Sequence, residues 1–194
     1  MTNEAISGRN ELDLVTRILH FGLAVFGILA LATGDLAGDY KKVENVGFIV
    51  HGCIGLGVAL FVGLRFGYGI FGPAPIRFWN WVPYNRKRLK LVSEDIKGLM
   101  AFRLPDRQPH QGLASLVETI GLLIFAFLAV TGVMLYVTIE PGHKAQGTAH
   151  FIKELHEAGE ILLPLFFLTH IGAVILHALT GCHLWRKMIF LEKD

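Results

Sequence analysis

Residues 154–179 read ELHEAGEILLPLFFLTHIGAVILHAL, an apolar run that carries three histidines. Its core, residues 161–180, is long enough to cross a bilayer, because a spanning helix needs about 20 apolar residues. The more polar stretch 150–160 indicates that the helix continues beyond the hydrocarbon. Ionisable groups inside a membrane are costly and are functional candidates by default. The histidines of this segment therefore need a chemical explanation.

The composition points to a membrane protein. Hydrophobic residues make up 53% of the 194 and charged residues only 18%, whereas soluble domains carry about a quarter charged residues. We expect one domain over residues 1–194, an all-α integral membrane four-helix bundle. The expected spans lie at about 14–34, 46–66, 116–138 and 151–180. A net charge of only +2 gives no indication of a nucleic-acid partner.

The distribution of lysine and arginine predicts the orientation in the membrane. Of 18 such residues, nine lie in 65–107, two (Arg9 and Arg17) lie before or at the start of the first span, and three follow the last. The positive-inside rule then places both termini and the 67–115 loop in the cytoplasm of a multi-pass protein of the bacterial inner membrane. Within that loop, residues 86–102 form either a short amphipathic helix on the inner surface or a plain charged loop.

Four histidines fall at two matching depths. His156 and His170 are 14 residues apart, about 1400° of helix, so they share one face. The topology pairs His51 with His156 in the outer half and His20 with His170 in the inner half. Any one of them alone would be read as a satisfied core or interfacial histidine. Together they predict the axial ligands of two haems b, since bis-imidazole iron has no open position and favours electron transfer.

Two further residues are site candidates at the inner end. Arg17 lies three residues before His20 on the same face; it either meets a haem propionate or anchors the helix by extending to the lipid headgroups. His177 lies two turns beyond His170. It either hydrogen-bonds a quinone or an inner-haem propionate, or it is an interfacial histidine at the helix end.

The chain resembles the bacterial and hydrogenase-type cytochrome b561 family over nearly its whole length. The most specific pieces are RFGYGIFGPAPIRFWNWVP (65–83) and the 154–189 stretch from ELHEAGE to WRKMI. The resemblance implies a four-helix bundle with two haems b. It also implies ligands from helices one, two and four, with two histidines fourteen residues apart on the last.

The expected function is transmembrane electron transfer by a cytochrome b subunit of an oxidoreductase complex. It would link the quinone pool to a periplasmic redox partner, by resemblance a dehydrogenase, a hydrogenase or a cytochrome c. One alternative is a stand-alone superoxide:quinone oxidoreductase, and another is a haem-free membrane anchor. Quinone reduction needs protons, so the titratable inner end is the expected quinone side. The two short loops, near 35–45 and 139–150, should face outside. The cationic groups on that side could steer an acidic redox partner: Lys41, Lys42, His143, His150 and Lys153.

Overall fold

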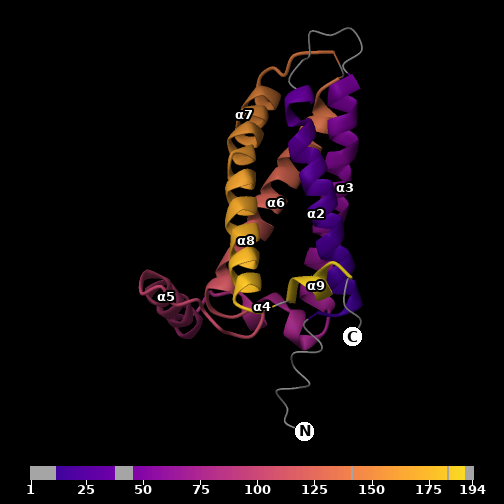
Figure 1. Ribbon diagram of the computed structural model, residues 1–194. Helices are drawn as coiled ribbons and strands as arrows, with labels where there is room; N and C mark the ends of the chain where they lie inside the picture. The colour runs from indigo at the N-terminus through magenta and orange to yellow at the C-terminus, as the bar shows by residue number, and fades with distance from the viewer. Residues whose placement is uncertain (1–11, 38–45, 141, 183, 191–194) are drawn as a thin grey trace. The chain divides into compact units, whose positions relative to one another are not determined.

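The computed structural model describes residues 12–37, 46–140, 142–182 and 184–190, and most of them are helical (Figure 1). This described part contains no β-strand. Four stretches are long and apolar enough to cross a membrane: α2 (Leu14–Ala37), α3 (Val46–Phe71), α6 (Gly112–Thr138), and α7 (Thr148–Glu160) with α8 (Leu162–Leu179). The predicted all-α membrane protein with four spans is confirmed. The termini, and Lys41 and Lys42 of the expected outer loop, lie outside the described residues.

The span boundaries differ from the predicted ones in two ways. Helix α3 continues to Phe71 and α6 begins at Gly112, so both extend further into the 67–115 loop than their apolar cores indicate. The fourth span is interrupted at Ile161, between α7 and α8. Pro164 explains the interruption, because proline has no N–H to donate to the carbonyl of Glu160 and its ring crowds that carbonyl.

The chain forms two compact units, and each is described by itself. The first unit comprises Met1–Ile18, Arg65–Gly121 and Leu168–Asp194. The second comprises Leu19–Leu64 and Leu122–Phe167. The long helices contribute residues to both units, so a single apolar span belongs partly to each.

Close helix contacts hold the second unit together. A Cβ added at Gly22 on α2 would lie 2.1 Å from the ring of Phe61 on α3, and one at Gly27 would lie 2.6 Å from Phe125 on α6. Small residues at such positions let membrane helices approach closely, and this packing replaces the hydrophobic driving force that lipid removes. Phenylalanine rings thus fill the space that the glycines leave.

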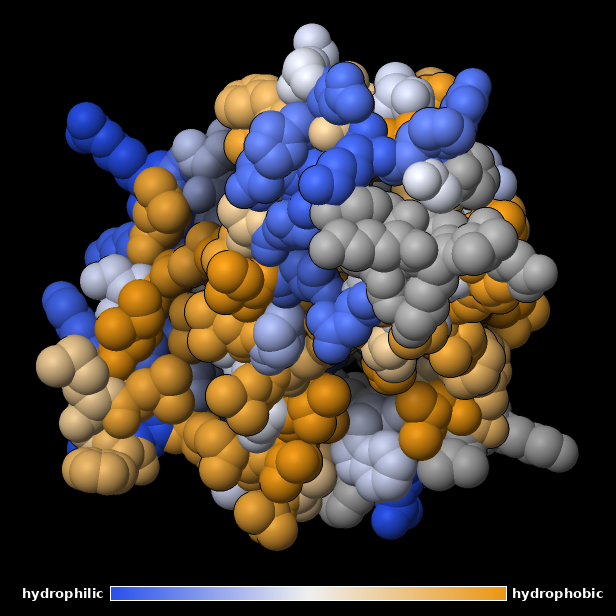
Figure 2. Space-filling view, turned by 90° about the horizontal axis from the view of Figure 1, so that it is seen from above, coloured by the Kyte–Doolittle hydropathy of each residue, from blue (hydrophilic) through white to orange (hydrophobic). Residues whose placement is uncertain are grey.

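The outer faces of these helices are apolar. Leu60 on α3 is 59% exposed and Val130 on α6 is 61% exposed. Figure 2 shows hydrophobic side chains over much of the sides and lower half of its view, and hydrophilic ones gathered over its upper part. Exposed apolar faces on helices of spanning length are the surface that lipid tails contact.

The first unit holds the shorter helices, η1 (Ala74–Ile76), α4 (Phe78–Trp81), α5 (Arg86–Met100) and α9 (Leu184–Met188). Helix α5 begins with a capping interaction, in which the side chain of Asn85 accepts a hydrogen bond from Arg88 N at 3.0 Å. Val92 on α5 is buried, whereas Leu89 and Ile96 are exposed. The predicted amphipathic helix is therefore present, and its placement on the membrane surface remains a prediction.

Asp95 ties α5 to the start of α6. Its carboxylate accepts from Arg107 Nε at 2.6 Å and from the backbone N–H of Leu113 at 2.8 Å, and Asp95 itself is only 5% exposed. Gly112 has φ +56°, and a Cβ there would lie 1.9 Å from Asp95 Oδ2. The hydrogen bond from Arg107 to Asp95 is the main cause that raises the pKa of Arg107. One buried carboxylate thus caps one helix and holds another.

Replacing Asp95→Ala should lower the free energy of unfolding by about 2 kcal/mol, because it leaves a helix N–H and a guanidinium without their acceptor. Glu94→Ala is the matched control, since Glu94 also contacts Arg107, at 3.1 Å, but is 46% exposed. That exposed pair should contribute less than about 1 kcal/mol. Thermal unfolding in detergent measures both changes, and equal losses would contradict the role given to Asp95.

Candidate functional site

The predicted outer histidine pair comes together within the second unit. His51 on α3 and His156 on α7 are both half-buried, and their ring centroids lie 6.3 Å apart with the ring planes at 81°. The sequence argument paired these residues from depth alone, and the packing of the helices now places the two rings beside each other.

The spacing of the two rings fits a shared metal. Metal–imidazole bonds are about 2.0–2.1 Å long, and an imidazole nitrogen lies about 1.1 Å from its ring centroid, so two imidazoles on opposite sides of one metal have centroids about 6.3 Å apart. The observed distance between the His51 and His156 centroids is 6.3 Å. An edge-on contact between two rings can have the same centroid distance, so the separation is compatible with a shared metal and gains weight from the lining described below.

Nδ1 of each of these imidazoles also contacts a threonine hydroxyl. Nδ1 of His51 lies 3.2 Å from Thr33 Oγ1 on α2, and Nδ1 of His156 lies 2.8 Å from Thr131 Oγ1 on α6. The sequence analysis did not identify either threonine. The sequence signal was a threonine within an apolar span, near the depth of a candidate ligand. On α6 this signal was not recognised, because α6 carries no histidine.

A cavity of about 290 Å³ adjoins the histidine pair. This volume is near the lower end of the range for small-molecule pockets. The lining is mainly apolar and comes from α2, α3, α6, α7 and α8; it includes Gly27, His51, Gly55, Phe125, Gly132 and His156. Two imidazoles, an apolar lining and a cavity suit a flat hydrophobic metal macrocycle.

Two glycines keep the histidine pair accessible. A Cβ at Gly132 would lie 3.1 Å from Cε1 of His156, which is tight enough to displace that ring. A Cβ at Gly55 would meet nothing within 4 Å, so it would occupy cavity space. A flat ligand that approaches the backbone needs small residues at such positions. The residues present therefore fit haem at this site.

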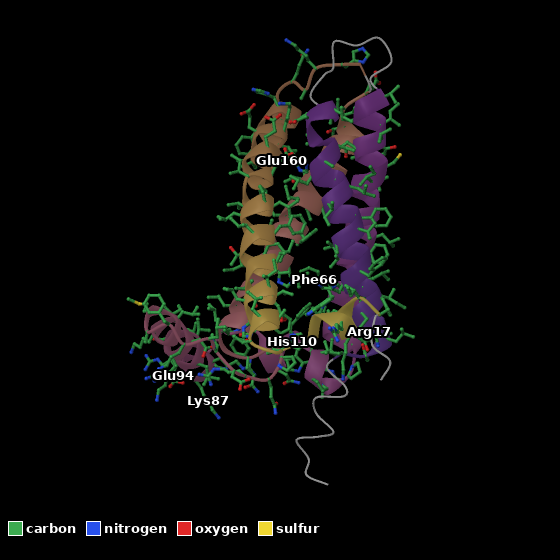
Figure 3. The ribbon with its side chains drawn as sticks, in the orientation of Figure 1. Arg17, Phe66, Lys87, Glu94, His110 and Glu160 are labelled. Carbon is green, nitrogen blue, oxygen red and sulfur yellow. The ribbon has the colours of Figure 1, made fainter. Side chains whose placement is uncertain are left out.

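Acidic groups stand at the same end of the second unit. Asp35, Glu157 and Glu160 are among the residues that line the cavity, and Figure 3 labels Glu160 on α7. The cationic groups expected to dock a partner have acidic neighbours here: Lys153 pairs with Glu157, His150 lies 3.8 Å from Glu154, and His143 lies 3.7 Å from Glu140. The expectation of a free cationic docking surface is not supported at these three residues.

The inner pair stays a prediction. His20 on α2 belongs to the second unit and His170 on α8 belongs to the first. Each side chain is half-buried. His177 lies in the last turn of α8, is also half-buried, and its carbonyl accepts from Cys182 N at 2.9 Å. Its quinone or propionate role stays a prediction.

Arg17 is buried near the start of α2. It is 5% exposed, and its guanidinium carbon lies 4.6 Å from the centroid of the Phe190 ring, within the first unit. Figure 3 labels Arg17 at this end of α2. Such burial disfavours the alternative in which the side chain extends to lipid headgroups. The propionate role remains a prediction.

The first unit also contains a titratable pair that the sequence did not reveal. Nδ1 of His110 lies 2.5 Å from Oε2 of Glu118, and the His110 ring centroid lies 5.2 Å from that of Trp81. His110 sits at φ +58°, which is uncommon for a residue other than glycine. Glu118, near the start of α6, thus lies against a histidine.

Asp13 caps the first span. Its carboxylate accepts from Thr16 N at 2.8 Å and from the hydroxyl of Tyr68. Burial raises the pKa of Asp13, but the hydrogen bonds from Tyr68 and Thr16 and the charge of Arg65 outweigh burial, so the pKa lies below its ordinary 3.8. The carboxylate is therefore the favoured form in the folded protein.

An Asp13→Asn variant tests this linkage, because asparagine keeps the capping oxygen but not the charge. A depressed pKa stabilises the fold above the unfolded value of about 3.9, and that contribution disappears as the pH falls through the folded value. The variant should therefore melt at a lower temperature than wild type at pH 7, and the gap should close below about pH 4. A gap that is constant from pH 7 to pH 3 would contradict the assignment.

Comparison with known proteins gives one clear result. The family model described as prokaryotic cytochrome b561 matches residues 11–190, nearly the whole chain. Searches for similar curated proteins and for similar solved structures give no match.

Proposed function

The chain belongs to the prokaryotic cytochrome b561 family, and from this premise we propose that it moves electrons across the bacterial inner membrane through two bis-histidine haems b. Family membership makes it a multi-pass membrane protein that binds haem b and transfers electrons. The proposal adds the ligands: His51 with His156 in the outer half and His20 with His170 in the inner half. The observation that carries it is the 6.3 Å separation of the His51 and His156 rings.

The residues of the outer site would act as holders and insulators. Haem b held there supplies a reversible one-electron couple. His51 and His156 would fill both axial positions, which leaves no coordination site for oxygen or peroxide. The apolar lining, with Phe125 among it, keeps bulk water from the couple. Such a site passes electrons on and does not carry out bond chemistry.

We place quinone at the cytoplasmic end. The family relationship is consistent with quinone interaction, and a quinone that takes two electrons also takes two protons. The first unit offers titratable side chains for this exchange, His177 and the His110–Glu118 pair among them. A histidine with an ordinary pKa near 6.5 suits proton exchange at neutral pH. The excess of lysine and arginine on the 65–107 side supports cytoplasmic termini.

The partner is proposed to be a periplasmic redox protein, a dehydrogenase, a hydrogenase or a cytochrome c, to which this chain would be the membrane subunit. The acidic residues around the outer cavity, Asp35, Glu157 and Glu160, lie at the end where that partner would dock. Co-purification of a redox subunit separates this function from that of a stand-alone superoxide:quinone oxidoreductase. The His51–His156 arrangement gives no support to a haem-free anchor.

The haem assignment predicts two low-spin haems b per wild-type chain. His51→Ala and His156→Ala should each remove the outer haem, and His20→Ala and His170→Ala the inner one, because each loses an axial ligand. His150→Ala is the control, since His150 is on α7 but exposed beside Glu154. Haem is counted per protein by absorbance. Wild type with fewer than two haems, or unchanged spectra in all four variants, would contradict the assignment.

The quinone assignment predicts that His177→Ala slows reoxidation of the haems by a quinone analogue by about tenfold or more, because a proton donor near the quinone is lost. Haem content is checked first and should be unchanged. Lys153→Ala, at the opposite end, is the control. Normal reoxidation in the His177 variant together with slow reoxidation in the Lys153 variant would move the quinone to the outer side.

A further inference from the structure

We propose that Thr33 and Thr131 are positioning residues that orient His51 and His156 as ligands and set the reduction potential of the metal between them. This inference rests on the proposed haem site, and it concerns the two residues behind the ligands. Both threonines lie in the second unit, on α2 and α6, so neither is on the helix of the histidine it contacts.

The hydroxyl protons of both threonines are already engaged. Thr33 Oγ1 donates to the backbone carbonyl of Leu29 at 2.8 Å, and Thr131 Oγ1 donates to that of Phe127 at 2.8 Å. A hydroxyl has one proton and two lone pairs. With the proton committed to its own helix, each threonine oxygen presents a lone pair to the nearby imidazole.

The direction of the threonine hydrogen bonds determines the tautomer of each histidine. Because each threonine proton points to its own helix, Nδ1 of His51 pairs with Thr33 Oγ1 as the donor, and Nδ1 of His156 pairs with Thr131 Oγ1 as the donor. The backbone of Ala30 also accepts a hydrogen bond from His51. A neutral imidazole with its proton on Nδ1 has its lone pair on Nε2. Both rings are thereby prepared to bind a metal through Nε2, each held by a helix other than its own.

The two contacts differ in strength. Nδ1 of His156 lies 2.8 Å from Thr131, which is 6% exposed, whereas Nδ1 of His51 lies 3.2 Å from Thr33, which is half-buried. The shorter and more buried hydrogen bond is the stronger. Thr131 also explains how α6, which carries no histidine, contributes to the site.

A hydrogen-bond acceptor at Nδ1 makes the imidazole a more basic ligand, and loss of such a partner typically weakens metal binding 10–100-fold. A more basic ligand stabilises ferric over ferrous iron. Removing the acceptor should therefore raise the potential, so that the reduced form is favoured. Hydrogen bonding around the ligands is one of the means by which proteins tune haem potentials.

The test uses the full-length protein in detergent and two readouts: haem retention against a competing apo-protein, and redox titration of the component lost in His51→Ala. Thr131→Val should weaken haem retention about tenfold. It should also shift the reduction equilibrium toward ferrous about tenfold, a rise of about 59 mV for one electron. Thr33→Val should do the same to a smaller extent.

Two control variants separate positioning from packing. Thr131→Ser keeps the hydroxyl and should restore both readouts to nearly wild-type values. Thr138→Val, two turns along α6, removes a hydroxyl that donates to Met134 O at 2.6 Å. Among the described contacts it touches no histidine, so its loss should leave both readouts unchanged.

Several outcomes would overturn the inference. These are wild-type potential and retention in both valine variants, a Thr138→Val effect equal to that of Thr131→Val, or no rescue by Thr131→Ser. If the valine variants do not fold, ¹⁵N shifts of labelled histidines in haem-free wild type decide: Nε2–H tautomers at His51 and His156 would overturn it. Wild type that binds no haem through these histidines would instead refute the proposed function, and this inference with it.

Discussion

The arrangement of the second unit centres on two imidazoles, those of His51 and His156, which lie side by side inside an apolar bundle. An imidazole in such surroundings needs a partner for its N–H and a use for its lone pair, because unsatisfied polar groups are costly away from water. For His51 and His156 the N–H is met by a threonine on a neighbouring helix. The lone pairs remain for a metal. The cavity beside these rings and the glycines around it suit the flat ligand that is proposed to bind there.

Small residues and large rings divide the work of packing. Gly22 and Gly27 let the rings of Phe61 and Phe125 pass close to the backbone of α2, which brings α3 and α6 near enough for the ligands and threonines to meet. At the site itself the glycines do the reverse. Gly132 spares the ring of His156, and Gly55 leaves space open. Glycine thus allows close helix packing at Gly22 and Gly27, and leaves space for a ligand at Gly55 and Gly132.

Polar and ionic contacts are more prominent in the first unit, because it contains more charged residues. Asp95 accepts hydrogen bonds from Arg107 and a helix N–H, and Asp13 accepts them from Tyr68 and a helix N–H. His110 pairs with Glu118. The buried carboxylate of Asp95 and the half-buried one of Asp13 are each stabilised by at least one donor distant in sequence. A unit with such protonatable groups suits proton exchange with a quinone, whereas the mainly apolar second unit suits electron transfer alone.

The sequence by itself determined the four apolar spans and the amphipathic helix after Asn85, because length and period are local properties of a chain. It also predicted a depth for each histidine from the charge asymmetry. It paired His51 with His156 for the same reason. Only the tertiary structure decided that Thr33 and Thr131 lie behind those rings and that Glu118 meets His110. These contacts join residues on different helices or distant turns. The rotation of each helix about its axis determines these contacts. That rotation depends on how side chains from several helices pack together, so it cannot be read from one stretch of sequence.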